Sequence, residues 1–327
     1  MKPGRRRSLL LLKIGVAAAA ALLAGELVFR AYVPMDALVY EDSENPQLAF
    51  QLRPGASGTK NGVEVAVNAQ GLRDEPVASP RPAGERRVVV VGGQETFGVG
   101  VPAERTFVRE LADGLIAPGD GRARTINLSM YSYHLSQKVE LACLRLQGLE
   151  PELAVLQVTE GDISSPPSPL LRFPRLKNWI RRHSALIRWA SERYYLRRRG
   201  VTAGIAGAPS PSEDFETTRQ ALRRFKACAD AAGAKSAILL LPDVSNPEGT
   251  APSELRRGVE SVAKEDALPL VDGAAALAAV PLAERKLYMT DPFLSPAAHR
   301  VLADALRKRL KPLLKRRPAA PPRRPSV

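Results

Sequence analysis

Four short segments of the chain contain residue types suited to acyl-transfer or acid–base chemistry. They are Gly92–Gly98 (GGQETFG), Ile126–Tyr133 (INLSMYSY), Val158–Asp162 (VTEGD) and Asp291–His299 (DPFLSPAAH). A serine close to a histidine, as with Ser132 and His134, can become a nucleophile activated by a general base. Two carboxylates, as in Glu160 and Asp162, can serve glycoside hydrolysis only at a defined separation. Closeness in sequence does not set that separation, so we interpret Asp162 as a loop or cap residue.

The segment Gly92–Gly98 follows four consecutive valines, Val88–Val91, which predict a buried strand. Gln94 lies where this strand gives way to a turn. An amide cannot be activated by a neighbouring base into an acyl-transfer nucleophile as a hydroxyl can. The segment has neither the G-x-G-x-x-G nor the G-K-[ST] pattern, so the sequence gives little support to phosphate binding. We interpret the next residue, Glu95, as a solvent-facing turn residue.

In their order and spacing, the four segments resemble the motifs of the SGNH (GDSL-like) hydrolases. Gly92–Gly98 resembles the family turn G-D-S-x-T-F-G, with Gln94 in the place of the nucleophilic serine. Ser132 stands at the position of the oxyanion-hole glycine, Gly161 at that of the oxyanion-hole asparagine, and Phe293 at that of the base histidine. Loss of one oxyanion donor alone lowers the rate of such an enzyme by roughly 10²–10³. The resemblance covers about residues 48–310, including the lead-in phrases Leu48–Gly58 and Val65–Asp74.

The resemblance also places two retained residues in the last segment. Asp291 matches the aspartate that orients the base, but Phe293 leaves it no histidine to orient. His299 matches a trailing histidine that helps to hold the loop, and Ser295 is expected to cap the following helix with Pro296 in its first turn. The resemblance therefore implies a scaffold without an intact set of catalytic residues. The ligand-binding candidates in the former cleft are Gln94, Ser132, Glu160 and Asp291.

These residues lead to three hypotheses about function. The favoured one is a noncatalytic protein that binds a glycan, an acylated ligand or a partner in envelope polysaccharide modification. An active esterase or acyltransferase with relocated residues is the second, using Ser132 with His134 or His183. Ser129 is a further candidate nucleophile beside His134. The third is a structural envelope protein that binds anionic lipid. We expect no cofactor, and the three histidines show no metal-ligand spacing.

The net charge of +14 is concentrated in three stretches of the sequence. Residues 1–13, 172–199 and 307–327 carry +5, +9 and +9, which leaves −9 for the rest of the chain. A nucleic-acid-binding domain presents a basic face, so we expect no nucleic-acid partner. Basic appendages on an acidic body instead suit a membrane surface or an anionic partner.

A basic cluster and a long apolar run form the amino-terminal part of the sequence. From Leu9 to Val33 only Lys13, Glu26 and Arg30 are charged, and about 20 apolar residues suffice to span a bilayer. The preceding basic residues predict a cytoplasmic amino terminus. We therefore expect a single-pass signal anchor in a bacterial-type inner (plasma) membrane, with a periplasmic domain after it. A cleaved signal peptide is the alternative.

From residue 86 onward, apolar segments alternate with segments of helical periodicity. Strands are expected at 87–91, 124–127, 153–158, 236–241 and 268–271, and helices at 104–116, 134–147, 213–232, 253–264 and 296–316. Apolar strands that are each followed by a helix predict a parallel sheet covered on both faces. The predicted fold class is therefore α/β, a three-layer flavodoxin-like (SGNH-hydrolase-like) sheet of about five strands, preceded by a transmembrane helix.

The sequence divides into four parts on this interpretation. Residues 1–33 form the cytoplasmic basic cluster and anchor, 34–85 a lead-in packed on the domain, 86–316 the SGNH-hydrolase-like domain, and 317–327 a disordered basic tail. Within the lead-in, Val63–Asn68 alternates as a short strand, and Asn68 and Gly71 are typical of a turn.

An insertion at 164–212 is too long for an ordinary connection. Apolar residues recur in it at helical spacing from Leu176 to Tyr194, with arginines between them. This pattern predicts a basic amphipathic cap helix near the strand ends. Its apolar stripe either contacts a membrane surface or packs on the domain.

The two cysteines, Cys143 and Cys228, are too few for a disulfide framework. Both lie in segments of helical pattern, so we favour buried free thiols. A single bridge between them is the alternative.

Overall fold

The computed structural model describes residues 3–33, 37–117, 121–131, 133–159, 174–191, 211–242, 254–285 and 293–314. The chain forms two compact units. Unit 1 comprises Met1–Leu38 and Leu170–Ala208, and unit 2 comprises Val39–Pro169 and Pro209–Val327. Most of the predicted insertion therefore groups with the amino-terminal helix. The predicted tail at 317–327 lies outside the described residues.

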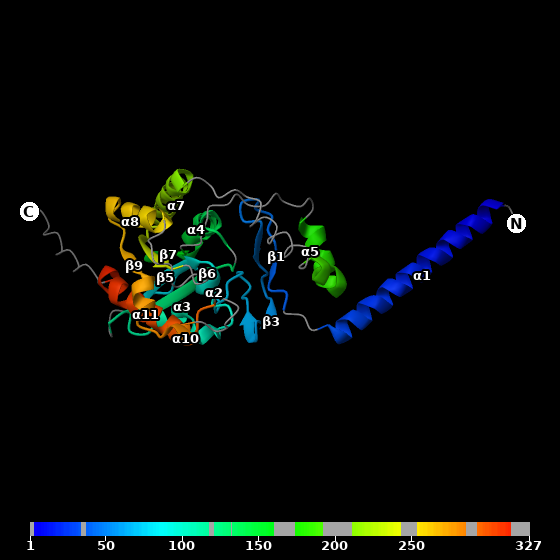
Figure 1. Cartoon of the computed structure of the whole chain (residues 1–327), viewed down its shortest axis with the longest axis horizontal. Helices are drawn as coiled ribbons and strands as arrows, with labels where there is room; N and C mark the ends of the chain where they lie inside the picture. The colour runs from blue at the N-terminus through cyan, green and yellow to red at the C-terminus, as the bar shows by residue number, and fades with distance from the viewer. Residues whose placement is uncertain are drawn as a thin grey trace, which may run out of the picture. The chain divides into compact units, whose positions relative to one another are not determined.

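Unit 2 is built on a five-stranded parallel sheet in the order β6-β5-β7-β8-β9 (Figure 1). Its strands are β5 (Glu85–Gly92), β6 (Arg122–Ser129), β7 (Leu153–Thr159), β8 (Lys235–Leu241) and β9 (Leu270–Asp272). All five predicted strands and their parallel arrangement are confirmed. If the five strands are numbered 1 to 5 along the chain, their order in the sheet is 2-1-3-4-5. The chain therefore adds its second strand on one side of β5 and the remaining strands on the other side. In such folds, sites form beyond the carboxyl ends of the strands next to this change of side.

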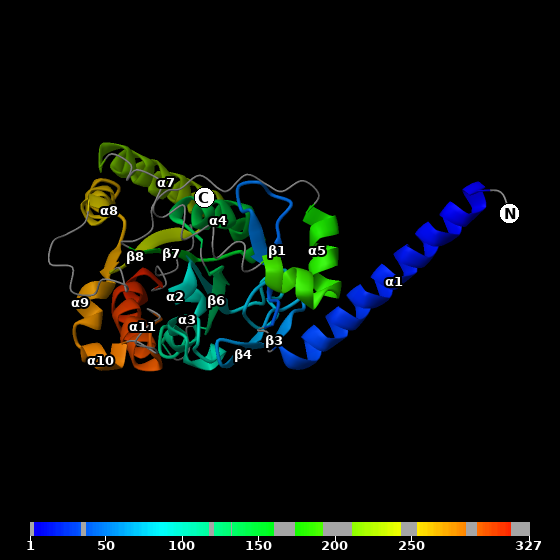
Figure 2. The same ribbon diagram turned by 45° about the vertical axis from the view of Figure 1, so that its right-hand side comes forward.

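Helices cover both faces of this sheet, which confirms the three-layer architecture (Figures 1 and 2). One face carries α4 (Leu135–Leu149), α7 (Pro211–Ala231) and α8 (Glu254–Glu265), which pack on one another in that order. The other carries α3 (Phe107–Leu111), α9 (Gly273–Leu277) and α11 (Pro296–Leu310), where α11 packs on both α3 and α9. The short helix α10 (Leu282–Arg285) precedes α11 in the chain.

Two of the predicted helices are shorter than expected. In place of a helix over 104–116, a 3-10 turn η1 (Ala103–Arg105) precedes α3. The hydroxyl of Thr106 between them accepts a hydrogen bond from the N–H of Arg109 and so begins a new helix. The predicted helix 296–316 ends at Leu310 and continues as a 3-10 turn η2 (Lys311–Leu314) that contains a proline. Ser295 caps α11 as predicted, because its hydroxyl accepts from the N–H of Ala298.

The cysteines correct the free-thiol prediction. Cys143 in α4 and Cys228 in α7 form a disulfide, with their Cα atoms 5.0 Å apart although the residues are 85 positions apart in sequence. The two helices pack side by side on the sheet, and this proximity cannot be read from residues so distant in the chain. Structural disulfides persist mainly in oxidising compartments.

The lead-in of unit 2 consists of two antiparallel hairpins. The first joins β1 (Tyr40–Asp42) to β2 (Phe50–Leu52), and the second joins β3 (Ser57–Lys60) to β4 (Val63–Ala66). Only the last of these strands was predicted. The turn expected around Asn68 and Gly71 is confirmed: the Asn68 side chain accepts from the N–H groups of Gln70 and Leu72, and Gly71 has a φ of 75°.

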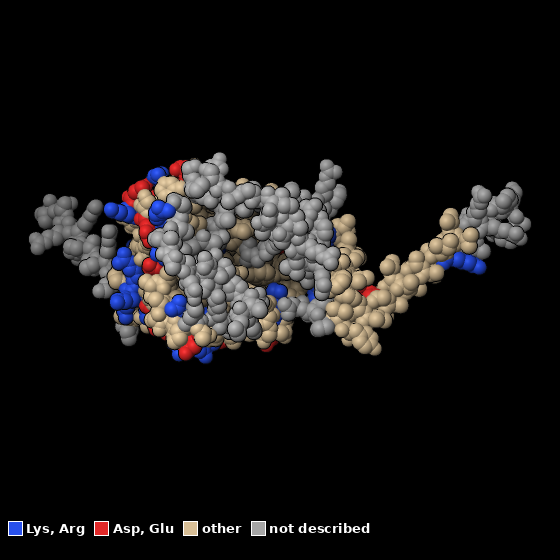
Figure 3. All heavy atoms as spheres, viewed as in Figure 1, with Lys and Arg blue, Asp and Glu red and all other residues tan. Residues whose placement is uncertain are grey.

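Unit 1 contains the long helix α1 (Pro3–Tyr32) and two short helices of the insertion. Within α1, Leu10–Tyr32 is long and apolar enough to cross a membrane and is not buried. Figure 3 shows a long uncharged stretch of this helix, which corresponds to the residues between Lys13 and Glu26. The insertion was predicted as one helix, but α5 (Pro174–His183) ends before Ser184 and a second helix covers 185–191.

Candidate functional site

The turn between β5 and α2 (Gln94–Phe97), called here the β5–α2 turn (Gly92–Gly98), lies at the carboxyl edge of the sheet. Close packing explains its first glycine. A Cβ on Gly92 would lie 1.9 Å from the Thr96 hydroxyl oxygen and 2.7 Å from Oε1 of Gln157. Gly98 closes the short helix with a φ of 78°, in the left-handed region that glycine occupies without strain. The strand–turn–helix expected from the sequence is therefore present.

Gln157, in the middle of β7, holds the start of this turn. Its Oε1 accepts from the Gly93 N–H at 2.8 Å and from the Thr96 hydroxyl at 3.2 Å. Its Nε2 donates to the Thr159 hydroxyl at 2.6 Å. Gln157 is fully buried, and an amide placed there satisfies polar groups that would otherwise be buried without partners. A polar residue inside an otherwise apolar strand was the only sequence signal for this role.

Arg73, in the lead-in, holds the end of the turn. Its guanidinium donates to the carbonyl oxygens of Phe97 at 2.6 Å, Gly98 at 2.7 Å and Val101 at 2.6 Å. It also lies over the Phe97 ring, 4.8 Å from the centroid. Burial lowers the pKa of Arg73 to about 10, so the group remains charged at neutral pH.

The neighbouring Asp74 connects the same lead-in to β6. Its carboxylate pairs with Arg124 at 2.8 Å and accepts from the Asn127 N–H at 2.8 Å. Burial raises the pKa of Asp74, and the Arg124 charge opposes that shift. Asn127 in turn donates from its side chain to the Thr96 carbonyl at 2.8 Å. Arg73 and Asp74, at the end of the lead-in phrase Val65–Asp74, therefore both support the turn. The sequence did not reveal this role.

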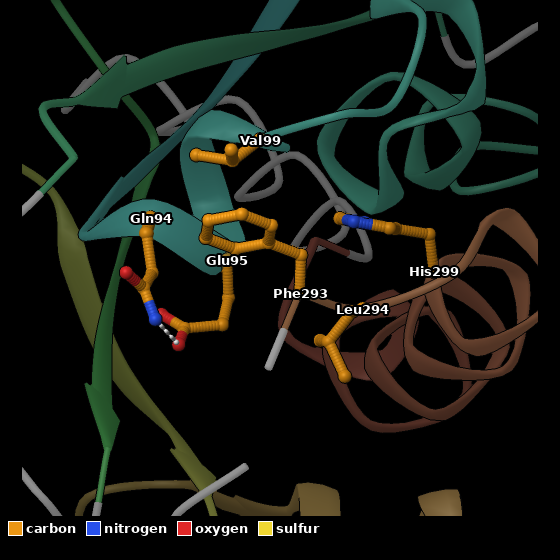
Figure 4. Close-up of a pocket in the computed structure, with 6 residues that line it drawn as sticks. All are labelled: Gln94, Glu95, Val99, Phe293, Leu294 and His299. Carbon is orange, nitrogen blue, oxygen red and sulfur yellow. Dashed lines mark hydrogen bonds between the residues drawn. The ribbon is translucent and has the colours of Figure 1, made fainter. Parts of the chain in front are cut away.

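Gln94, which the sequence resemblance aligns with the family nucleophile, donates from its amide Nε2 to Oε1 of Glu95 at 3.1 Å. The prediction of a solvent-facing Glu95 is wrong, because this residue is buried at 5% exposure. Figure 4 shows why: the Phe293 side chain extends toward α2, and its ring lies beside Glu95 and Val99. Phe293 therefore fills space in front of the turn with apolar atoms that cannot accept a proton.

The space that remains between these residues is small. Gln94, Glu95, Val99, Phe293, Leu294 and His299 line a small hollow in which these side chains leave no room for a water molecule (Figure 4). Ligand pockets commonly have volumes of about 300–1,000 Å³. The described part of this pocket thus resembles a packed interior more than a binding cleft.

His299, in α11, is completely buried and performs a structural task. Its Nδ1 accepts from the Phe107 N–H at 3.0 Å, and its ring stacks on Phe107 with the centroids 5.6 Å apart. Burial, together with the charge of Arg73, lowers the pKa of His299 to about 3. A neutral imidazole is required at this hydrogen bond, because the unprotonated Nδ1 must accept. His299 therefore holds the beginning of α3.

Several predicted site residues are not brought together by the described structure. Ser132, Glu160, Gly161 and Asp291 lie outside the described residues, as does Asp162. Ser129, a candidate substitute nucleophile, is buried and donates its hydroxyl to Oδ1 of Asn127. His134 occupies the N-cap of α4, where its N–H donates to Oε1 of Gln137 at 3.2 Å. His183 belongs to unit 1 and places its Nδ1 2.8 Å from the Trp179 carbonyl oxygen.

The site therefore has a preserved framework and altered chemical groups. The strand order 2-1-3-4-5 and the β5–α2 turn agree with the resemblance seen in the sequence. The chain is SGNH-hydrolase-like in fold. Among the residues that the structure describes, no group of three or more His, Cys, Asp or Glu is arranged to hold a metal ion.

Comparison with known proteins identifies lipolytic hydrolases as structural neighbours. TesA is 21% identical over 70% of this chain and 100% of its own, with a TM-score of 0.47. The esterase EstA from Pseudoalteromonas is 13% identical over 70% of this chain and 98% of its own, with a TM-score of 0.46. A member of the lipolytic G-D-S-L family from Veillonella parvula is 10% identical over 68% and 97%, with a TM-score of 0.44. No protein-family model and no curated protein matches the chain.

Proposed function

We propose that this protein is a noncatalytic, membrane-anchored SGNH-hydrolase-like protein of the cell envelope. On this proposal, unit 2 docks a protein partner in envelope polysaccharide modification and does not hydrolyse an ester. The observation that carries the proposal is the pairing of Gln94 with Glu95 beneath the ring of Phe293. Neither an amide nor a phenyl ring can supply the nucleophile or the base of acyl transfer.

The size of the pocket favours a partner protein over a small ligand. A sugar or an acyl chain at the β5–α2 turn would have to displace Phe293, since the described side chains around it leave no room even for a water molecule. The network that binds the turn, with Arg73 and Gln157, keeps the scaffold rigid without any reactive group. A rigid scaffold of this kind suits presentation of a surface.

Two further observations favour an extracytoplasmic location for unit 2. The apolar part of α1 is long enough to span a membrane and follows a basic cluster, which orients such helices with the amino terminus in the cytoplasm. The Cys143–Cys228 disulfide is suited to an oxidising compartment. We therefore place unit 2 on the periplasmic side of a bacterial-type inner membrane.

The absence of hydrolysis is tested with the full chain in detergent micelles, using short acyl esters and acetylated sugars. We expect turnover at the level of the protein-free reaction. The matched variant is Gln94→Ala, which removes the amide and leaves the turn glycines unchanged, and it should behave like the wild type. Turnover well above background that is abolished by Ser132→Ala would instead establish the relocated-esterase hypothesis.

The choice between a partner and a small ligand has a separate test. Acetylated oligosaccharides and fatty acyl chains should leave the melting temperature of the wild type unchanged, because Phe293 occupies the space in front of the turn. The variant Phe293→Ala opens that space and should allow a measurable shift with the ligand that fits. A clear shift with the wild type would mean that the cleft binds a ligand and that the docking proposal is wrong.

A further inference from the structure

Three side chains on one face of α1 bind the short helices of the insertion. Glu26, Phe29 and Arg30 are spaced as i, i+3 and i+4, which places them side by side on a helix. Phe29 meets the ring of Trp189 edge to face, with the centroids 5.5 Å apart. Arg30 donates from Nη2 to the carbonyl oxygen of His183 at 2.6 Å, at the end of α5. All these contacts lie within unit 1.

Glu26 makes the most extensive of these contacts. Its two carboxylate oxygens accept from the Ser184 hydroxyl at 2.9 Å, the Ala185 N–H at 2.5 Å and the Leu186 N–H at 3.1 Å. The carboxylate thus caps the helix at 185–191 from another segment of the chain, where the N–H groups would otherwise lack partners. It also pairs with Arg30 at 2.7 Å.

The position of Glu26 along α1 gives these contacts a place relative to a bilayer. Glu26 lies six residues before Tyr32, the last residue of the candidate span, which corresponds to about 9 Å along a helix. An ionised carboxylate is costly inside hydrocarbon and is usually paired there. Because its oxygens are bound by Arg30 and by the insertion, Glu26 holds residues 174–191 (the insert helices) against the last two turns of the candidate span.

In the insert helices large apolar side chains are exposed and one arginine is buried, which is the opposite of a helix packed on a protein. Leu176 and Trp179 are 57% and 59% exposed, while Arg181 on the same helix is only 4% exposed. Ile187 is 49% exposed. An amphipathic helix of a water-soluble domain normally buries its apolar stripe. Leu176 and Trp179 are therefore not covered by the other residues of unit 1.

The charge of the insert helices is of one sign. They contain no acidic residue, and their basic residues are Arg175, Lys177, Arg181, Arg182 and Arg188. Tryptophan is enriched at the boundary between lipid and water, and clustered basic side chains beside a span attract anionic headgroups. Exposed apolar side chains among basic ones are the pattern of a helix that lies in the membrane interface.

We propose that the insert helices are a second membrane contact, which binds anionic phospholipid beside the point where α1 leaves the bilayer. The apolar side chains Leu176, Trp179 and Ile187 enter the headgroup–acyl boundary, and the exposed basic side chains Arg175 and Arg182 meet lipid phosphates. Glu26 fixes the helices to the anchor, so that the insertion and α1 act as one attachment. This contact does not depend on whether unit 2 is catalytic.

Fluorescence gives a local test, because Trp179 and Trp189 are the two tryptophans of the chain. The full chain is reconstituted in phosphatidylcholine vesicles with and without phosphatidylglycerol, with bromine on the acyl chains as a quencher. Trp189→Phe leaves Trp179 as the reporter. We expect strong quenching of Trp179 in the anionic vesicles and a blue-shifted emission. The substitutions Arg175→Gln, Lys177→Gln and Arg182→Gln each remove one positive charge and should weaken the lipid contact by about fivefold per charge. The measured sign is that added salt halves the quenching of Trp179 at a lower concentration than in the wild type.

The controls separate this contact from the anchor and from loose phosphate binding. Because α1 keeps every variant in the vesicle, loss of quenching reports the insert helices alone. The matched charge variant Arg300→Gln, Lys308→Gln and Arg309→Gln, in α11 of unit 2, should leave quenching unchanged. Soluble glycerophosphate should not reverse it if an interface is required, and reversal would identify a phosphate site in place of a lipid surface. Equal Trp179 emission with brominated and ordinary lipids would overturn the proposal.

Discussion

In unit 2 the β5–α2 turn is held by buried polar side chains, whereas in unit 1 the largest apolar side chains of α5 are exposed. Arg73 and Gln157 are buried and bonded to the backbone or side chains of the turn. Leu176 and Trp179 have more than half of their surface exposed. The difference shows where each unit finds its partners. The turn is satisfied within unit 2, and on our proposal lipid completes α5.

The β5–α2 turn also shows which residues support it. The bonds made by Gln157 and Arg73 go to Gly93, Thr96, Phe97, Gly98, Val101 and Thr159, and none of them uses the side chain of Gln94 or Phe293. If the proposed loss of catalysis is right, the scaffold of the turn therefore depends on other residues than the reaction does.

The largest expected effect concerns the buried histidine of unit 2. The pKa of His299 is about 3 in the folded protein and about 6.5 when unfolded. Between pH 6.5 and pH 3, the histidine is protonated in the unfolded chain but not in the folded protein. The contribution of neutral His299 to the unfolding free energy is therefore complete above pH 6.5 and is lost as the pH falls toward 3. The loss is several kcal/mol, at most about 5 kcal/mol.

Thermal unfolding measured from pH 7 to pH 4 checks this expectation. The variant His299→Asn keeps an acceptor near the Phe107 N–H but cannot be protonated. Its melting temperature should therefore depend less on pH than that of the wild type. His183→Gln, in the exposed part of unit 1, is the control and should retain the wild-type slope. An unchanged slope in His299→Asn would mean that other groups control the acid sensitivity.

Removing the guanidinium of Arg73 should have the next largest effect. Arg73→Met leaves three carbonyl oxygens of the turn without their donor, and we expect a loss of about 3–5 kcal/mol of unfolding free energy. Arg109→Met is the matched control, since Arg109 is 41% exposed and pairs with Glu75, which should cost less than about 1 kcal/mol. Urea unfolding of both variants tests whether the turn depends on buried polar bonds. Equal losses in the two would contradict that view.

The disulfide should rank third. Cys143→Ser with Cys228→Ser removes the bond between α4 and α7, and we expect a loss of about 2–4 kcal/mol. Intact-mass measurement with and without reductant establishes whether the bond forms in the cell. If the protein isolated from its membrane carries two free thiols, the oxidising location proposed for unit 2 is wrong.

The smallest effect is expected on the exposed face of unit 1. Leu176→Gln should change the unfolding free energy by no more than about 0.5 kcal/mol in detergent, because its side chain is mostly exposed. The same variant should reduce the lipid quenching of Trp179. A large loss of stability would show that Leu176 is packed against protein, which would remove the contrast between the two units.

Much of the fold followed from local pattern. The five strands were predicted because consecutive valines and leucines mark strands buried on both faces, and the helices between them imply parallel order. Ser295 was identifiable as a cap because its role needs only the next three residues. The span within α1 followed from length and apolar composition alone.

Roles that depend on distant partners were not predictable in this way. Glu95 was assigned to solvent because a turn is usually exposed, but it is buried, and Phe293, almost 200 residues later in the chain, lies beside it. The Cys143–Cys228 bond depends on two helices packing side by side. Arg73 and Gln157 received no role because their acceptors and donors lie far away in sequence.

The sequence by itself determined the α/β class, the strand–turn–helix at Gly92–Gly98, and the presence of an amide at Gln94 and a phenyl ring at Phe293. These features depend on residue type and on spacing within a few positions. The tertiary structure decided which side chains are buried, that Arg73 and Gln157 hold the turn, and that Glu26 binds the insert helices. Burial and hydrogen bonding are set by contacts between segments far apart in the chain, and a linear pattern does not contain those distances.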